Sequence, residues 1–237
     1  MRVAALYDVH GNLPALVAVL AELEREDVDT LVVGGDVLWG PFQAECLAAL
    51  RPYDPLFVAG NCERDVLAAV NESSAWCRAQ LGEDDLAFVS GWPLTAELQL
   101  NGLGSALFCH ATPRSDEEIL TRTTPEEDVA VSLSGVDAGV VVCGHTHVQY
   151  DRRVSGAPRL VNAGSVGLPY QGEPGAFWAL LGPEVELRRV TYDVDAALAS
   201  LATSGFPSAA EIFGDSLRGA ASAESATAYF ESKRRER

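Results

Sequence analysis

Short apolar runs alternate with polar segments along the first part of the chain. Residues 3–7, 30–33, 56–59 and 140–143 have the length and β-branched content of buried strands. After the first run, Leu13, Leu16, Val17 and Leu20 keep a helical spacing, and Asn12 with Pro14 marks where that helix begins. Segments 43–50 and 61–70 favour helices behind the next two strands. The order of strand, polar loop and helix predicts an α/β protein.

The pattern changes in the second half. Residues 97–100 and 105–109 flank a Gly-rich turn and predict a hairpin. Residues 72–93 mix helix and loop, 125–133 favour a helix, and 148–154, 159–161, 176–181 and 185–190 favour strands. From Asp193 onward the chain is alanine-rich and helical in two or three pieces. No Pro/Ser-rich linker divides it, so we expect one domain over 1–237 with a helical C-terminal segment at about 193–237.

Composition narrows the class of protein. No apolar stretch approaches the roughly 18 to 20 residues of a membrane span. The N-terminus runs directly into a strand pattern without a signal-peptide cleavage region, so we expect a cytoplasmic protein. The five cysteines lack C-x-x-C spacing and suit reduced thiols in the core rather than a disulfide framework.

The charge balance limits the partners. A formal net charge of −17 argues against non-specific binding to nucleic acid or to an anionic membrane. The tail from Glu231 to Arg237 is basic, either as a partner contact or as a solvated helix end. Lys233 is the only lysine, which excludes a P-loop lysine and a Schiff-base lysine. The charge balance is also compatible with a homo-oligomer.

Polar side chains with metal-binding chemistry stand at the ends of the strand-like runs. They are Asp8, His10, Asp36, Asn61, His110, His145 and His147, which include all four histidines of the chain. Such nitrogen and oxygen donors suit Mn²⁺, Fe²⁺, Zn²⁺ or Ni²⁺. Seven donors exceed one four-coordinate ion but suit two ions roughly 3.5 to 4 Å apart that share a carboxylate. Each short motif taken alone is also compatible with an ordinary loop or turn.

Taken together and in this order, the motifs D-x-H, G-D, G-N, H and G-H-x-H resemble the calcineurin-like metallophosphoesterase superfamily, over residues 8–147. Longer stretches at 8–16, at Gly35-Asp36 with Gly40-Pro41, and at 162–169 look like its small bacterial branch. That branch is similar to compact phosphodiesterases and, in some members, to hydrolases of dinucleoside polyphosphates. The resemblance implies a four-layer αββα sandwich of two mixed β-sheets flanked by helices.

The resemblance also assigns the ligands of two divalent ions. Metal 1 takes Asp8, His10, Asp36 and His147. Metal 2 takes Asp36, Asn61, His110 and His145, which makes Asp36 the bridge. A water held between the ions would lose its proton and attack phosphorus in line, with Asp36, Asn61, His110 and position 62 nearest the chemistry.

Position 62 departs from the commoner family pattern. Many members have histidine after Gly-Asn, at or near the general acid, whereas this chain has Cys62. A thiol with an ordinary pKa of about 8.5 is a poorer proton donor at neutral pH than an imidazolium. We therefore expect the change to affect specificity rather than to abolish activity.

Five further residues are candidate substrate contacts, each with a structural alternative. Asn12 would reach the phosphate or cap a helix. Trp39 would stack on a nucleobase or pack in the core. Glu63 and Arg64 would contact substrate, support the ligands or begin a solvated helix. Ser165 would place a hydroxyl near the metals or form a structural turn.

Two functions are compatible with this pattern. The first is a dinuclear metal-dependent phosphoesterase that hydrolyses phosphodiesters or nucleotide phosphoanhydrides, with a small phosphoester or nucleotide as substrate. The second is a non-catalytic protein-binding scaffold on the same fold, as in the retromer subunit that resembles these enzymes. Loss of ligands would favour the scaffold, but all seven ligand positions are filled.

Overall fold

Strands and helices alternate through the first third of the computed structural model, which describes residues 1–236. The strands are β1 Val3–Leu6, β2 Thr30–Val33, β3 Leu56–Phe57, β4 Thr95–Leu100, β5 Gly104–Cys109, β6 Val140–Cys143, β7 Tyr150–Arg152, β8 Arg159–Asn162, β9 Ala176–Leu181 and β10 Val185–Val190. The helices are α1 Leu13–Leu23, α2 Gln43–Leu50, α3 Asn61–Ala68, α4 Glu72–Ala79, α5 Glu83–Ser90, α6 Glu126–Ser132, α7 Val194–Ala202, α8 Ala209–Leu217 and α9 Ala223–Glu236, with a short 3-10 helix at Arg51–Tyr53.

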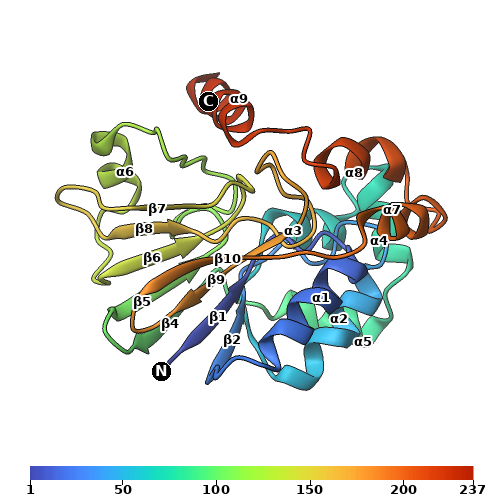
Figure 1. Ribbon diagram of the computed structural model, residues 1–237, viewed down its shortest axis with the longest axis horizontal. Helices are drawn as coiled ribbons and strands as arrows, with labels where there is room; N and C mark the ends of the chain where they lie inside the picture. Colours follow the sequence, from blue (N-terminus) through green and yellow to red (C-terminus); the bar gives the residue numbers. More distant parts are fainter. Residues whose placement is uncertain (237) are drawn as a thin grey trace.

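The strands form two five-stranded sheets, ordered β10-β9-β1-β2-β3 and β4-β5-β6-β8-β7. Each sheet is mixed, because β1 pairs with β2 in parallel but with β9 antiparallel, and β8 pairs with β6 in parallel but with β7 antiparallel. Helices α1, α2 and α5 lie on the outer side of the first sheet, and α6 lies outside the second (Figure 1). The predicted sandwich of two mixed sheets between helices is therefore confirmed.

The alternation of side chains along β1 joins the layers. Ala4 and Leu6 pack with the helices outside, whereas Val3, Ala5 and Tyr7 pack between the two sheets. The hydroxyl of the fully buried Tyr7 donates a 2.9 Å hydrogen bond to the carbonyl of Val142 in the other sheet. The Tyr7 side chain thus fixes β1 against β6, next to the loops that follow both strands.

Several elements differ in extent from the sequence prediction. Residues 72–93 contain two defined helices, α4 and α5. The third and seventh strands are shorter than expected, because β3 pairs with its one neighbour over two residues and β7 over three. In the basic tail, Arg234 pairs with Glu231 and Asp128, while Arg237 lies outside the described residues. No helix within residues 1–236 is long and apolar enough to cross a membrane.

Gly34 provides the first test of this packing. A Cβ at Gly34 would lie 1.9 Å from Tyr7 Cε1 and would displace the ring that joins the sheets. We expect Gly34→Ala to lower the free energy of unfolding by about 1–3 kcal/mol, the usual cost of an overpacked core. Urea denaturation measures this cost. Gly91→Ala is the control, because its nearest atom would be 3.4 Å away, and equal stability of the two variants would contradict the role of Tyr7.

Candidate metal centre

Loops at one edge of the two sheets bring the seven predicted ligands together. Two aspartates follow β1 and β2, two histidines follow β6, His110 follows β5, and Asn61 begins α3; the full set is Asp8, His10, Asp36, Asn61, His110, His145 and His147. The sheets' register explains the convergence, because β1 and β2 run parallel, as do β5 and β6, so their carboxyl ends meet at the same edge.

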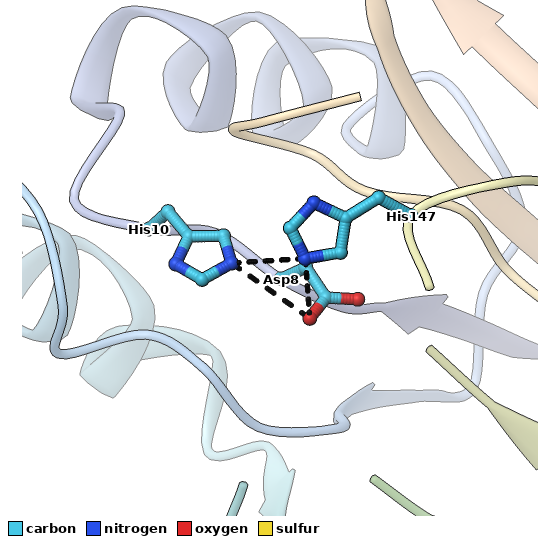
Figure 2. Close-up of side chains that lie close together, drawn as sticks. All are labelled: Asp8, His10 and His147. Atoms are coloured by element: carbon cyan, nitrogen blue, oxygen red, sulfur yellow. Dashed lines mark hydrogen bonds and ion pairs between the residues drawn. The ribbon is translucent and has the colours of Figure 1, made fainter. Parts of the chain in front are cut away.

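One group of donors comes from the loop after β1 and the loop after β6. Asp8 Oδ1 lies 3.3 Å from His147 Nε2 and 3.9 Å from His10 Nε2, and the two Nε2 atoms are 3.1 Å apart (Figure 2). All three side chains are buried. This geometry presents one carboxylate oxygen and two imidazole nitrogens to a common point, as metal 1 requires.

The second group surrounds Asp36. Its Oδ2 lies 3.5 Å from His110 Nε2 and 3.8 Å from His10 Nε2, between donors of the two predicted sites. The Asn61 amide oxygen is 3.1 Å from His110 Nε2. The His145 ring packs edge-on against His110, with ring centroids 5.2 Å apart. The position of Asp36 suits a bridging carboxylate, and Asp8 Oδ1 is also within 3.9 Å of His110 Nε2.

Backbone carbonyls fix the orientation of three imidazoles. The Nδ1 atoms of His10, His110 and His147 lie 3.2, 2.9 and 2.6 Å from the carbonyl oxygens of Trp39, Gly34 and Leu168. A carbonyl only accepts, so each Nδ1 carries the hydrogen and each neutral ring presents an unprotonated Nε2 to the centre. Such outer hydrogen bonds are the usual device for setting the tautomer of a metal-binding histidine.

The arrangement fits a bound cation. Asp8 Oδ1 is buried and has no hydrogen-bond partner among the described residues when the His147 ring is neutral, whereas a protonated His147 Nε2, at 3.3 Å, would pair with it. When both rings are neutral, as binding to a cation requires, the Nε2 lone pairs of His10 and His147 face each other at 3.1 Å. Unpartnered buried acceptors are costly. A divalent ion would satisfy all three atoms, so the residues present fit the metals that the donor set implies.

Strained backbone is concentrated at this centre. Eight non-glycine residues of the described chain have positive φ, and five of them are the ligands Asp8, His10, Asp36, His145 and His147, with φ between 47° and 65°. This left-handed conformation is uncommon for non-glycine residues and persists where surrounding contacts enforce it. It lets two side chains that are separated by one residue, such as His145 and His147, point to the same centre.

The carboxylates control the charge of two imidazoles. Burial lowers the pKa of His110 and of His147, but the negative charge of Asp36 on the first and of Asp8 on the second outweighs it. Both pKa values therefore lie above the usual value. A metal ion would have to displace protons from these two rings.

The other two imidazoles are already available as ligands. Burial, aided by the nearby charge of His147, lowers the pKa of His10 to about 4. Burial and the charge of His110 do the same for His145, whose pKa is also about 4. Both rings are neutral at pH 7 and can bind a cation without losing a proton.

Cys62 lies inside the cluster, where the sequence prediction placed no sulfur ligand. Its thiol donates to Asp36 Oδ2 at 3.0 Å, and its backbone N–H donates to Asp36 Oδ1 at 2.8 Å. Burial and the adjacent Asp36 charge raise the pKa of the thiol well above its usual value. Cys62 is therefore a neutral thiol that holds Asp36, and its hydrogen is directed at that carboxylate.

Three of the candidate substrate contacts have structural partners instead. Glu63 is buried, and its carboxylate accepts hydrogen bonds of 2.7–3.1 Å from the backbone N–H groups of residues 36, 37, 38 and 60. Asn12 caps α1 and donates to the Gly167 carbonyl. Ser165 donates to the Asp8 carbonyl and accepts from Leu168 N–H. These residues hold the ligand loops in place and have no free polar group to offer a substrate.

The remaining two candidates lie in different places. Arg64 is on the surface, paired with Asp65, Asp116 and Glu117, and does not line the cavity over the ligands. Trp39 does line this cavity of about 320 Å³, and its ring packs edge-on against His10. Trp39 thus keeps both the packing role and the opportunity to contact a substrate.

Tyr170 was not predicted from the sequence, yet it also lines the cavity. Its ring stacks on His147 with centroids 4.9 Å apart and 14° between the planes. Tyr170 follows the Asn162–Pro169 stretch, whose resemblance to the bacterial branch was the available signal. The walls of the cavity are therefore more aromatic than the ligand motifs alone indicated.

Glu63 gives the second prediction. The substitution Glu63→Gln keeps the shape of the side chain. It replaces one acceptor oxygen of the carboxylate by an NH₂ group, which then faces backbone N–H donors. We expect a loss of about 1–3 kcal/mol in the free energy of unfolding, together with weaker metal binding because the loop carrying Asp36 is loosened. Urea denaturation and metal titration measure the two effects. Glu45→Gln, on the exposed surface of α2, is the control; parent-like values for Glu63→Gln would refute the positioning role.

Comparison with known proteins agrees with this geometry. A model of the calcineurin-like phosphoesterase superfamily domain matches residues 1–181. The uncharacterized protein MJ0912 of Methanocaldococcus jannaschii is 26% identical over 232 residues, which cover 86% of this chain and 93% of that protein.

Solved structures are similar over nearly the whole chain. A metallophosphoesterase from Sphaerobacter thermophilus is 25% identical with a TM-score of 0.73, covering 93% of this chain and 98% of that one. The hypothetical protein PH1004 from Pyrococcus horikoshii OT3 shares the fold at 18% identity, with a TM-score of 0.79 and coverage of 92% and 98%. With the domain match over residues 1–181, the chain belongs to the calcineurin-like phosphoesterase superfamily, a family of metal-dependent phosphoesterases.

Proposed function

We propose that the protein is a dinuclear metal-dependent phosphoesterase that hydrolyses phosphodiesters or nucleotide phosphoanhydrides. The observation that carries the proposal is the convergence of the seven donor side chains at one edge of the sheets, where three imidazole nitrogens lie within 3.9 Å of the buried Asp8 Oδ1. Three overlapping groups each hold their ligand atoms within 4.8 Å of one another: Asp8, His10 and His147; Asp8, Asp36 and His110; and His10, Asp36 and the Cys62 sulfur. A single four-coordinate ion would leave several of these donors unused.

The family pattern divides the donors between two ions. Asp8, His10, Asp36 and His147 would hold metal 1, and Asp36, Asn61, His110 and His145 would hold metal 2. Imidazole-rich sites favour Mn²⁺, Fe²⁺, Ni²⁺ or Zn²⁺ over Mg²⁺. When bound, two such ions supply an activated water and positive charge for the phosphoryl oxygens.

The residues that line the cavity over the ligands limit the charge of the substrates that it can bind. Within residues 1–236, no lysine or arginine lines the cavity over the ligands. The positive charge that meets a phosphate must therefore come from the metal centre. The thiol and the backbone N–H of Cys62 both donate to the Asp36 carboxylate, and Glu63 accepts from the backbone of the loop that carries Asp36. The proposed bridging carboxylate is therefore oriented before a metal or a substrate binds. This rigidity reduces the reorganisation needed for reaction.

The scaffold alternative receives no support from the site. A scaffold has no need for buried ligands held in left-handed backbone, whereas a metal centre does. The five cysteines are free and buried, which suits the reducing cytoplasm that the sequence predicts. The cytoplasmic location and the oligomeric state stay predictions.

Metal removal tests the proposed function. Protein treated with a chelator should not hydrolyse bis(p-nitrophenyl) phosphate, and activity should return with Mn²⁺, Ni²⁺ or Fe²⁺ more than with Mg²⁺, because four of the donors are imidazoles. Metal analysis after reconstitution should find about two ions per chain.

Asp36→Asn serves as the matched variant for this experiment. It keeps the size of the bridge but removes its charge, so it should bind less of both ions and lose several orders of magnitude in turnover while retaining the parent circular dichroism. Full activity of metal-free parent protein, or activity of Asp36→Asn within about tenfold of the parent, would exclude the dinuclear mechanism.

Cys62 leads to a prediction about the leaving group. Its hydrogen is directed at Asp36, so it is not available to protonate a departing alkoxide. We expect kcat/KM to fall steeply as the pKa of the leaving group rises across a series of aryl and alkyl diesters. Cys62→His should raise the rates of the poor leaving groups, by up to about 10²- to 10⁴-fold where a general acid is well placed.

The serine variant is the control for this series. Cys62→Ser keeps a donor to Asp36 without adding a general acid, so its dependence on leaving-group pKa should match the parent. A parent whose rates hardly vary with leaving-group pKa would show that another residue protonates the leaving oxygen.

A further inference from the structure

Helix α9 lies apart from the two sheets and over the loops that carry the ligands (Figure 1). It begins at Ala223, after the region 1–181 that matches the family domain. The buried Glu231 fastens it: Oε1 accepts hydrogen bonds of 2.6 and 2.5 Å from the hydroxyls of Thr121 and Thr124. Arg234 pairs with both Glu231 and Asp128. This polar network fixes one side of the helix.

The segment before α9 is attached to the loop that carries Tyr170. Gly172 N–H donates a 2.9 Å hydrogen bond to the Ala221 carbonyl, and the Ser216 hydroxyl donates a 2.6 Å bond to the Pro169 carbonyl. The loop with Tyr170 and the start of α9 are therefore held together. The position of α9 relative to the ligands is defined from two sides.

This placement brings an α9 side chain to the metal centre. The Phe230 ring centroid is 6.4 Å from that of His145 and 6.4 Å from that of Tyr170. Tyr170 in turn stacks on His147. Phe230 and Tyr170 thus form an aromatic wall beside ligands of both predicted ions, and neither ring is needed to hold a metal.

Tyr170 separates two adjoining cavities. One is the cavity over the ligands, and the other, of about 230 Å³, is lined by Tyr170, Phe230, Tyr229 and small residues of the α9 segment. Among residues 1–236, neither cavity is lined by lysine or arginine. A second phosphate or a carboxylate would find no counter-charge here, whereas a flat uncharged ring would bury apolar surface against both side chains.

We propose that Tyr170 and Phe230 are specificity-determining residues that bind a flat apolar or aromatic substituent of a phosphodiester. This inference rests on the proposed function, since it assumes that the phosphoryl group lies at the metal centre. It narrows the substrate from phosphoesters in general to diesters that carry such a ring next to the reacting phosphorus. Extended polyphosphates are disfavoured because nothing beside the wall neutralises their charge.

Two non-hydrolysed probes of equal charge test the wall. Methyl phenylphosphonate and methyl methylphosphonate are both monoanions, but only the first has a ring. Calorimetry on metal-reconstituted parent protein should show about tenfold or greater preference for the phenyl probe, in line with the strength of aromatic stacking. The preference should fall to about threefold or less in Phe230→Leu, which keeps apolar bulk without a flat ring, and in Tyr170→Leu.

Phe88→Leu is the matched control. Phe88 is, like Phe230, a phenylalanine on a helix, but it is more exposed and its ring contacts Phe57, Trp92 and Arg51, away from the metal centre. Its variant should keep the parent preference. Circular dichroism and thermal unfolding confirm that each variant is folded.

The outcomes separate the two proposals. Equal binding of both probes by the parent, or an unchanged preference in the Phe230 and Tyr170 variants, overturns the role of the wall, even if the protein hydrolyses diesters. A phenyl preference that depends on Phe230 and Tyr170 supports the wall, even if no diester is hydrolysed; in that case only the proposed function fails.

Discussion

Two carboxylates and four imidazoles share one buried edge of the sandwich, and the cost of keeping them there governs the structure around them. Charged groups removed from water must be paired, hydrogen-bonded or bound to a cation. The chain meets this demand with carbonyl oxygens behind three imidazoles, with Cys62 on Asp36, and with the unpartnered Asp8 Oδ1 directed at the centre. The carbonyl oxygens and Asp8 leave acceptor atoms directed at the centre, and Cys62 fixes the orientation of Asp36, an arrangement that suits a bound cation better than a folded core.

The packing between the sheets serves the same end. Tyr7 comes directly before Asp8, and its hydroxyl is bonded to the strand that precedes His145 and His147. Fixing this one ring therefore fixes the separation of ligands that are more than 130 residues apart in the sequence. Glu63 has a similar role, because its buried carboxylate accepts from the backbone of the loop that begins at Asp36 and from Gly60 before α3. Precision at the centre depends on these neighbours as much as on the ligands.

The sequence predicted which polar side chains converge at this edge because strand ends can be recognised from apolar runs, and the carboxyl ends of parallel strands must meet. The two mixed sheets followed from the family resemblance. Support of the ligands was one of three alternatives for Glu63, and the sequence could not select it, since a glutamate at a helix start is usually solvated and its four backbone partners come together only in the folded protein. The position of Phe230 could not be predicted either. The spacing of apolar residues in α9 indicates that one face of the helix is covered, but not that this face lies over His145.

Left-handed backbone at five ligands also limits how this centre can change. Apart from glycine, the residue types that adopt positive φ most readily are asparagine, aspartate and histidine, whereas β-branched residues are strongly disfavoured there. At Asp8, His10, Asp36, His145 and His147, the main chain thus accepts the oxygen and nitrogen ligands with least strain, before any coordination preference applies. The shape of these loops therefore limits which side chains can be presented at the centre, whatever ion they would hold.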